Sequence, residues 1–112
     1  MELQIKGRNL EVSESMRTFA ERKLAKIGKL VHESTRIEVE LSVEKNPSVA
    51  ANQVAEATVW LKGKTLRCTK ATRDMKSSID ELTEKLHREL AELRDKRVTA
   101  RRRPAAEPQP PA

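Results

Sequence analysis

The sequence predicts an α+β domain with the order β-α-β-β-β-α, folded as a two-layer sandwich with a four-stranded sheet and both helices on one face. Two segments place apolar residues at helical spacing, and four segments alternate apolar and polar residues. Each predicted strand has one apolar and one polar face, so both helices should cover the same side of the sheet. The chain has 112 residues, which is enough for one small domain and not for two.

The first strand is expected around Leu3 and Ile5, which alternate with polar residues before Gly7. Ser13 is the expected N-cap of a first helix that reaches Val31. Because this helix joins the first two strands, the two strands should be parallel through a right-handed crossover. The remaining strand pairs should be antiparallel hairpins.

The clearest strand covers residues 35–44, where apolar residues alternate strictly with acids and other polar residues. A third strand is expected over residues 53–62, and Lys62-Gly63 forms a two-residue hairpin loop. The fourth strand follows, with Cys68 on its inner face, and ends between residues 70 and 73. Three strands therefore follow the first helix without interruption.

The longest periodic segment is residues 74–97, which contain no Gly or Pro and are rich in good helix formers. Asp74 is the expected N-cap, and Ser77 with Asp80 offers a second possible start. One stripe of this helix carries apolar residues in steps of three and four, so it should pack on the sheet. The stripe consists of Met75, Ile79, Leu82, Leu86, Leu90 and Leu93.

The composition changes after Arg97. Three consecutive arginines precede the sequence PAAEPQPPA, which holds four prolines in nine residues and no apolar face. We therefore expect residues 1–97 to form the domain and residues 98–112 to form a disordered Arg/Pro-rich tail or the start of a linker.

Several classes of function receive no support from the residues. The two histidines are far apart in sequence, Cys68 falls on an inner strand face, and no Cys/His cluster or Gly-rich phosphate loop exists. We expect no catalytic residue, no metal, no cofactor and no small-molecule substrate. The chain has no run of 18 apolar residues and no signal-peptide h-region, and its single cysteine suits a reducing compartment. These features favour a cytoplasmic protein that is not bound to a membrane.

The basic residues carry the stronger signal, since the net charge is +6 and the sequence pI is about 9.8. Residues 62–73 hold five bases and no acid. Aromatic residues make up only 2% of the chain, so we expect contacts to phosphates of structured RNA rather than base stacking. The alternative is a solvated surface of mixed charge. The candidate RNA-binding residues are Arg22, Lys23, Lys26, Lys29, Lys64, Arg67, Lys70, Arg73, Lys76, Lys85 and Arg88.

Five segments in order resemble the ribosome hibernation-promoting factors, also called ribosome-associated inhibitors or sigma-modulation proteins. They are LQIKGRNLEV, MRTFAERKLAKI, IEVELSVEKN, ATVWLKGKTLRCTKATRDM and SSIDELTEKLHREL, which span residues 3–90. The resemblance implies the same β-α-β-β-β-α fold. It also implies a protein that binds the small ribosomal subunit between head and body, where it occupies space needed by tRNA and mRNA and silences idle ribosomes.

The resemblance implies site residues as well. Lys23 and Lys26 match basic positions of the family's first helix, and Lys85 and Arg88 match those of its last helix. Lys76 departs from the pattern, because the family usually has an aromatic residue there. Glu92 also departs, because a base is common at its position.

The expected partners are the ribosomal RNA of the small subunit and the whole ribosome. Long forms of the family add a C-terminal domain that pairs ribosomes, and this chain is expected to be a short form with a tail or a truncated long form. Two other classes stay open: a free-standing double-stranded-RNA-binding module, and a protein-interaction module whose charges only solubilise it.

Overall fold

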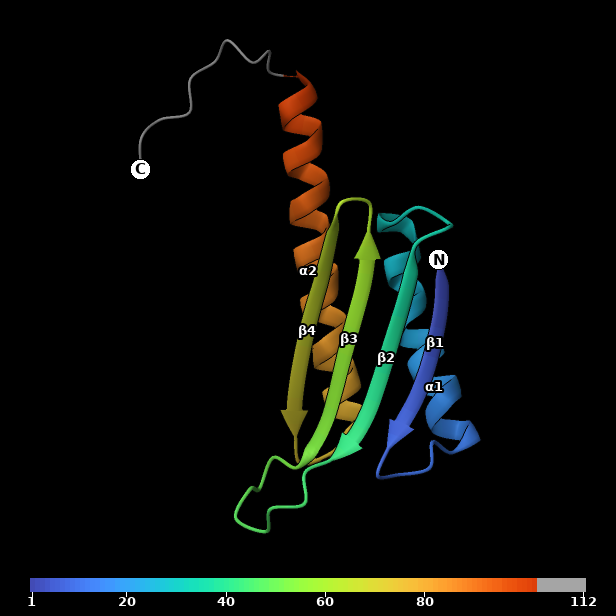
Figure 1. Cartoon of the computed structure of the whole chain (residues 1–112), viewed down its shortest axis with the longest axis vertical. Coiled ribbons are helices and arrows are strands. Elements are labelled where there is room, and N and C mark those ends of the chain that lie inside the picture. The colour runs from blue at the N-terminus through green and yellow to red at the C-terminus, as the bar shows by residue number, and fades with distance from the viewer. Residues whose placement is uncertain (103–112) are drawn as a thin grey trace.

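The computed structural model describes the backbone of residues 1–102 and the side chains of residues 1–95. Its elements follow the predicted order β-α-β-β-β-α (Figure 1). They are β1 (Glu2–Arg8), α1 (Glu14–Leu24), a 3₁₀ helix η1 (Ala25–Leu30), β2 (Arg36–Val43), β3 (Gln53–Leu61), β4 (Lys64–Thr72) and α2 (Met75–Arg102).

The sheet has the order β1-β2-β3-β4. β1 and β2 are parallel, and the other two pairs are antiparallel hairpins, as the pattern predicts. β1 and β4 therefore run in the same direction, and each is followed by a helix that returns along the sheet. Figure 1 shows the consequence, which is that both helices lie on one face and begin at the same end of it.

The core lies between the sheet and the two helices. α2 packs across β3 and β4, where Ala55 and Ala57 are fully buried and their short side chains allow close approach of the helix. The predicted stripe of α2 points into this layer. The largest fully buried side chains include Leu24, Ile27, Ile37, Val39, Leu41, Val59, Ile79, Leu82 and Leu86.

Side-chain hydrogen bonds fix the start of each helix. Ser13 Oγ accepts a hydrogen bond from the backbone N–H of Met16 at 3.2 Å, and Asp74 Oδ2 accepts one from Ser77 at 3.1 Å. Both predicted N-caps are confirmed. The fully buried Ser78 donates to the carbonyl oxygen of Gln53 at 2.6 Å, which ties the first turn of α2 to the start of β3.

The two helices differ from their predicted extents. The first helix does not stay α-helical to Val31, because its last six residues tighten into the 3₁₀ helix η1, as helix ends often do to satisfy their carbonyl groups. α2 continues beyond residue 97 to Arg102, since no glycine or proline lies between the start of the helix and Pro104. The rest of the predicted tail, residues 103–112, lies outside the described residues.

Gly7 shows why the chain turns sharply after β1. A Cβ at this position would clash with the carbonyl oxygen of Leu10, so the turn needs a residue without a side chain. The next turn residue, Asn9, has a φ of 65°, a left-handed conformation that Asn tolerates. Within the part of the chain that the structure describes, no helix has the length and apolar character needed to cross a membrane.

Candidate nucleic-acid interface

Three exposed bases follow one another from the end of α1 into the 3₁₀ helix η1. Arg22 lies in the last turn of α1, and Lys26 lies four residues further on, in η1. Lys29 follows in η1, where a 3₁₀ helix stacks residues three apart directly above one another. All three side chains are exposed, so the row faces solvent along the length of α1 and η1.

A second group of charges lies between the two helices. The ammonium group of Lys23 is 3.1 Å from Oδ1 of Asp80, so this ion pair joins α1 to α2. The ring of Phe19 lies beneath it, with the Nζ atoms of Lys23 and Lys76 each 5.6 Å from the ring centroid. Helix packing therefore brings Lys23 and Lys76 together although they are distant in sequence.

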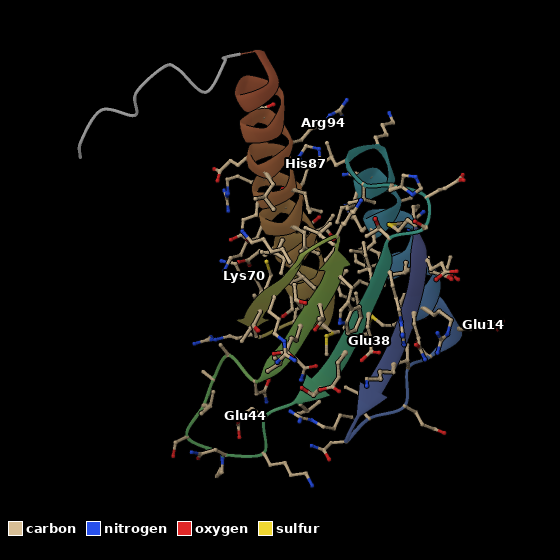
Figure 2. The ribbon with its side chains drawn as sticks, turned by 45° about the horizontal axis from the view of Figure 1, so that its top comes forward. Glu14, Glu38, Glu44, Lys70, His87 and Arg94 are labelled. Atoms are coloured by element: carbon tan, nitrogen blue, oxygen red, sulfur yellow. The ribbon has the colours of Figure 1, made fainter. Side chains whose placement is uncertain are left out.

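Arg94 joins this surface and was not among the candidates. Its guanidinium donates to the carbonyl oxygen of Lys29 at 3.4 Å, which brings the α2 flank against the end of η1. Figure 2 shows Arg94 and His87 on the side of α2 that is turned toward η1. Helical spacing could have found Arg94, because it lies 18 residues after Lys76, which is five full turns of an α-helix.

We define the interhelical flank as the basic residues that α1, η1 and α2 present along this side. It comprises six bases from three elements, and Asp80 of α2 lies among them. The bases are Arg22, Lys23, Lys26, Lys29, Lys76 and Arg94. The other side of α2 is different, since its exposed residues mix acids with bases.

The one-signed run at residues 62–73 does not form one surface. It lies on β4, whose alternation sends Arg67 to the open face, opposite Thr58 of β3. Lys70 lies on the helix side, opposite Ala55, and is half-buried at the outer edge of the sheet (Figure 2). Lys64 and Arg73 are exposed near the two ends of the strand. These side chains therefore divide among two faces and two ends.

Lys85 lies on the far flank of α2, beside the edge strand β4. There the Sγ atom of Cys68 donates to Oε2 of Glu89 at 2.6 Å. Burial is the main cause that raises the pKa of the Cys68 thiol to about 12, and Glu89 adds to it, whereas the nearby Lys85 and Lys70 act in the opposite direction. Cys68 is a buried, protonated thiol, as its inner-face position predicts. Arg88 is exposed on the outer surface of α2.

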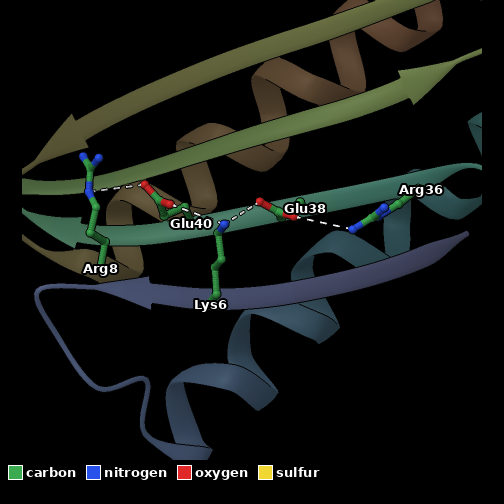
Figure 3. Close-up of polar contacts among 5 residues, drawn as sticks. All are labelled: Lys6, Arg8, Arg36, Glu38 and Glu40. Carbon is green, nitrogen blue, oxygen red and sulfur yellow. Dashed lines mark ion pairs between the residues drawn. The ribbon is translucent and has the colours of Figure 1, made fainter.

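The open face of the sheet carries charges that neutralise one another. Lys6 of β1 contacts Glu38 at 2.8 Å and Glu40 at 3.7 Å, and Arg8 contacts Glu40 at 3.4 Å (Figure 3). Arg36 contacts Glu38 at 3.8 Å and lies 5.1 Å from the ring of Trp60. The hydrogen bond from Lys6 lowers the pKa of Glu38, and the same contact raises the pKa of Lys6. This ladder leaves little net charge to attract a phosphate.

The chemistry available on these surfaces is electrostatic. Among the described residues, no group of three or more His, Cys, Asp or Glu side chains could hold a metal ion. Lysine and arginine side chains on a convex helical surface can contact successive phosphates of a folded RNA through charge-assisted hydrogen bonds. Of the three surfaces, the interhelical flank concentrates the most positive charge.

Comparison with known proteins places the chain in a family. Residues 3–98 match the family described as sigma 54 modulation protein / S30EA ribosomal protein, and the chain belongs to it. This membership supports a role in ribosome-associated regulation of translation.

Individual relatives agree with that family. The chain is 32% identical over 96 residues to a ribosome hibernation promoting factor of Salmonella typhimurium, which covers 86% of the chain and 96% of the relative. It is 30% identical over 112 residues to a ribosome hibernation promoting factor of Azotobacter vinelandii, and the match covers 98% of the chain and 100% of the relative. A ribosome hibernation promotion factor of Picosynechococcus sp. is 33% identical over 97 residues, and the chain spans only 50% of that relative.

Two solved structures show the same fold. The N-terminal domain of Thermus thermophilus Protein Y superposes with a TM-score of 0.71 at 26% identity, with 83% of the chain and 99% of that domain covered. A ribosomal subunit interface protein from Coxiella burnetii superposes with a TM-score of 0.70 at 22% identity, and the match covers 85% of the chain and 99% of that protein.

Proposed function

We propose that this protein is a ribosome hibernation factor that binds the small ribosomal subunit at the tRNA/mRNA decoding region and inhibits translation in idle ribosomes. Its partners in this proposal are the ribosomal RNA of that subunit and the whole ribosome, and its location is the cytoplasm. The proposed contact surface is the interhelical flank, extended by exposed bases such as Arg88 and Lys64.

The observation that carries the proposal is the gathering of six bases from three elements on one side of the fold. Phosphate contacts need only Lys and Arg at suitable positions, and they supply most of the affinity of a protein that lacks stacking residues. The names of the relatives favour the ribosome as the source of those phosphates. The proposal assigns no chemical step to the protein, so its action is to occupy space on the subunit.

The experiment compares two triple variants that remove the same charge. Lys26, Lys29 and Lys76 are replaced by Ala on the interhelical flank, and Arg8, Arg36 and Arg67 are replaced by Ala on the open face. Binding to purified small subunits is measured by sedimentation over a range of salt concentrations, and inhibition is measured in a translation reaction. Circular dichroism checks that both variants are folded.

The flank variant should bind small subunits on the order of 100-fold more weakly at moderate salt. The slope of log K against the logarithm of the salt concentration should be shallower by about two to three units. The affinity of the open-face variant for small subunits should stay within about threefold of the parent's affinity, since the three lost charges act only through the net charge of the protein. Equal losses in the two variants would contradict the proposed surface. Equally tight binding of the parent to a free duplex RNA would favour a free-standing double-stranded-RNA-binding module instead.

A further inference from the structure

Asp80 is an acid that lies among the bases of the interhelical flank. It belongs to α2 and lies one helical turn after Lys76, yet the structure pairs it with Lys23 across the helix interface at 3.1 Å. The side chain of Asp80 is 46% exposed and that of Lys23 is 29% exposed. The carboxylate of Asp80 is therefore accessible to solvent and to an approaching ligand, and the side chain of Lys23 beside it is less exposed.

The surroundings of this ion pair limit where the ammonium can go. The Phe19 ring supports the Nζ atoms of both Lys23 and Lys76 at 5.6 Å from its centroid. Two positive charges thus share one aromatic ring, and one of them already has a carboxylate partner. An RNA phosphate that reaches this point meets Lys76 free of any ion pair between described residues, and Lys23 occupied by Asp80.

We propose that Asp80 competes with RNA phosphate for Lys23 and thereby limits the affinity of this protein for RNA. The inference rests on the proposed function for its ligand, because it identifies a residue that tunes the same surface. When RNA binds, Lys23 exchanges its carboxylate partner for a phosphate, and the charge of Asp80 then lies beside another anion. The unfavourable proximity of those two anions offsets part of the gain from the new contact.

The competition predicts a coupling between two residues that a simple basic patch would not show. Lys23 contributes less to RNA affinity while Asp80 is present than after the carboxylate is removed, because its charge is already engaged. Once the carboxylate is removed, Lys23 should become a full phosphate contact. Substitutions at the two positions should therefore be strongly non-additive.

The test measures the binding of four variants to a short duplex RNA and to purified small subunits at several salt concentrations. The variants are Asp80→Asn, Lys23→Gln, the double variant, and Glu81→Gln as a matched control. Glu81 is the next residue on α2, is exposed, and makes no ion pair with the other described residues. Glu81→Gln changes the net charge by the same amount as Asp80→Asn but lies about 100° further round the helix, away from α1. Asp80→Glu keeps the carboxylate and serves as the conservative variant.

Asp80→Asn should bind duplex RNA about threefold to tenfold more tightly than the parent at low salt, with a log–log salt slope steeper by about one. Glu81→Gln should change affinity by less than about twofold. Lys23→Gln should abolish the gain in the Asp80→Asn background, and it should weaken binding less in the parent than in that background. Asp80→Glu should behave like the parent.

Two results would overturn the competition: an effect of Asp80→Asn no larger than that of Glu81→Gln, or weaker binding by Asp80→Asn, which would make Asp80 a residue that positions Lys23 for RNA. The two RNA probes separate this inference from the proposed function. If the parent fails to bind small subunits while the duplex RNA shows the coupling, the ribosomal function fails and the competition stands. If small subunits bind tightly without any coupling, the competition fails and the function stands.

Discussion

The two faces of this domain use charged residues in opposite ways. The open face of the sheet alternates acids and bases across neighbouring strands, and Lys6 pairs with both Glu38 and Glu40. The interhelical flank collects six bases, and Asp80 pairs with one of them, Lys23. The whole chain has 23 bases and 17 acids, so composition alone does not distinguish the faces. Topology decides which charges are satisfied within the protein and which remain to attract a partner.

The largest expected effect comes from breaking the layer that holds both faces in place. Leu86 is fully buried in the middle of the α2 stripe, so Leu86→Ala should reduce the free energy of unfolding by about 2–5 kcal/mol. Leu93→Ala is the matched control, because Leu93 is half-buried near the end of the same stripe and should cost clearly less. Denaturant melts measure both variants. A loss below about 0.5 kcal/mol for Leu86→Ala would mean that the stripe does not pack on the sheet.

The same stripe explains why the fold was predictable. Its 3.6-residue period, the strict alternation of residues 36–43 and the Lys62-Gly63 loop each reflect a local rule, and all three agree with one two-layer arrangement. The change to a 3₁₀ helix at Ala25 was not predictable in this way. Apolar residues three apart, at positions 24, 27 and 30, fit an α-helix and a 3₁₀ helix alike, so their spacing does not distinguish the two.

The candidate site was less accessible to sequence reasoning. The row of Arg22, Lys26 and Lys29 follows from helical spacing, but the meeting of Lys23 with Asp80 depends on how two distant helices pack. The run at residues 62–73 shows only that bases are concentrated in the sequence. Strand alternation and the bounds of β4 divide these bases between the two faces and the two ends of the strand.

The next prediction concerns the far flank of α2, where the buried thiol of Cys68 donates to Glu89. Because burial and Glu89 raise its pKa to about 12, from a usual value of 9.0, the thiolate is scarce at pH 8. Alkylation by iodoacetamide at pH 8 should therefore be about 1,000-fold slower in the folded protein than in denaturant. Mass spectrometry of the labelled protein follows both rates.

Glu89→Gln sharpens this prediction, because it removes the carboxylate and leaves the burial. The pKa of Cys68 should fall part of the way toward its usual value, and labelling should accelerate while staying slower than in the unfolded chain. Rapid labelling of the folded parent would mean that the edge between β4 and α2 is open. That flank would then offer a reactive group that the interhelical flank lacks.

The smallest expected effect belongs to the open face. The hydrogen bond from Lys6 lowers the pKa of Glu38 from its usual value of 4.5, so the pair stabilises the fold fully above pH 4.5 and loses this contribution as the pH falls through the lowered pKa. The pKa of Lys6 is raised above 10.5, so its contribution is present below that value and is lost as the pH rises through the raised pKa. Melting temperatures of the parent and Glu38→Gln, measured from pH 3 to pH 7, should converge at the acidic end and differ only slightly at neutral pH, since exposed ion pairs contribute little.

The same variant also tests the contrast between the open face and the interhelical flank. Glu38→Gln adds one unit of net positive charge, as Asp80→Asn does, but it should leave RNA affinity and its salt dependence nearly unchanged if RNA contacts only the helices. A gain in RNA affinity comparable to that of Asp80→Asn would mean that the open face also contacts RNA. The contrast between the two faces would then be wrong.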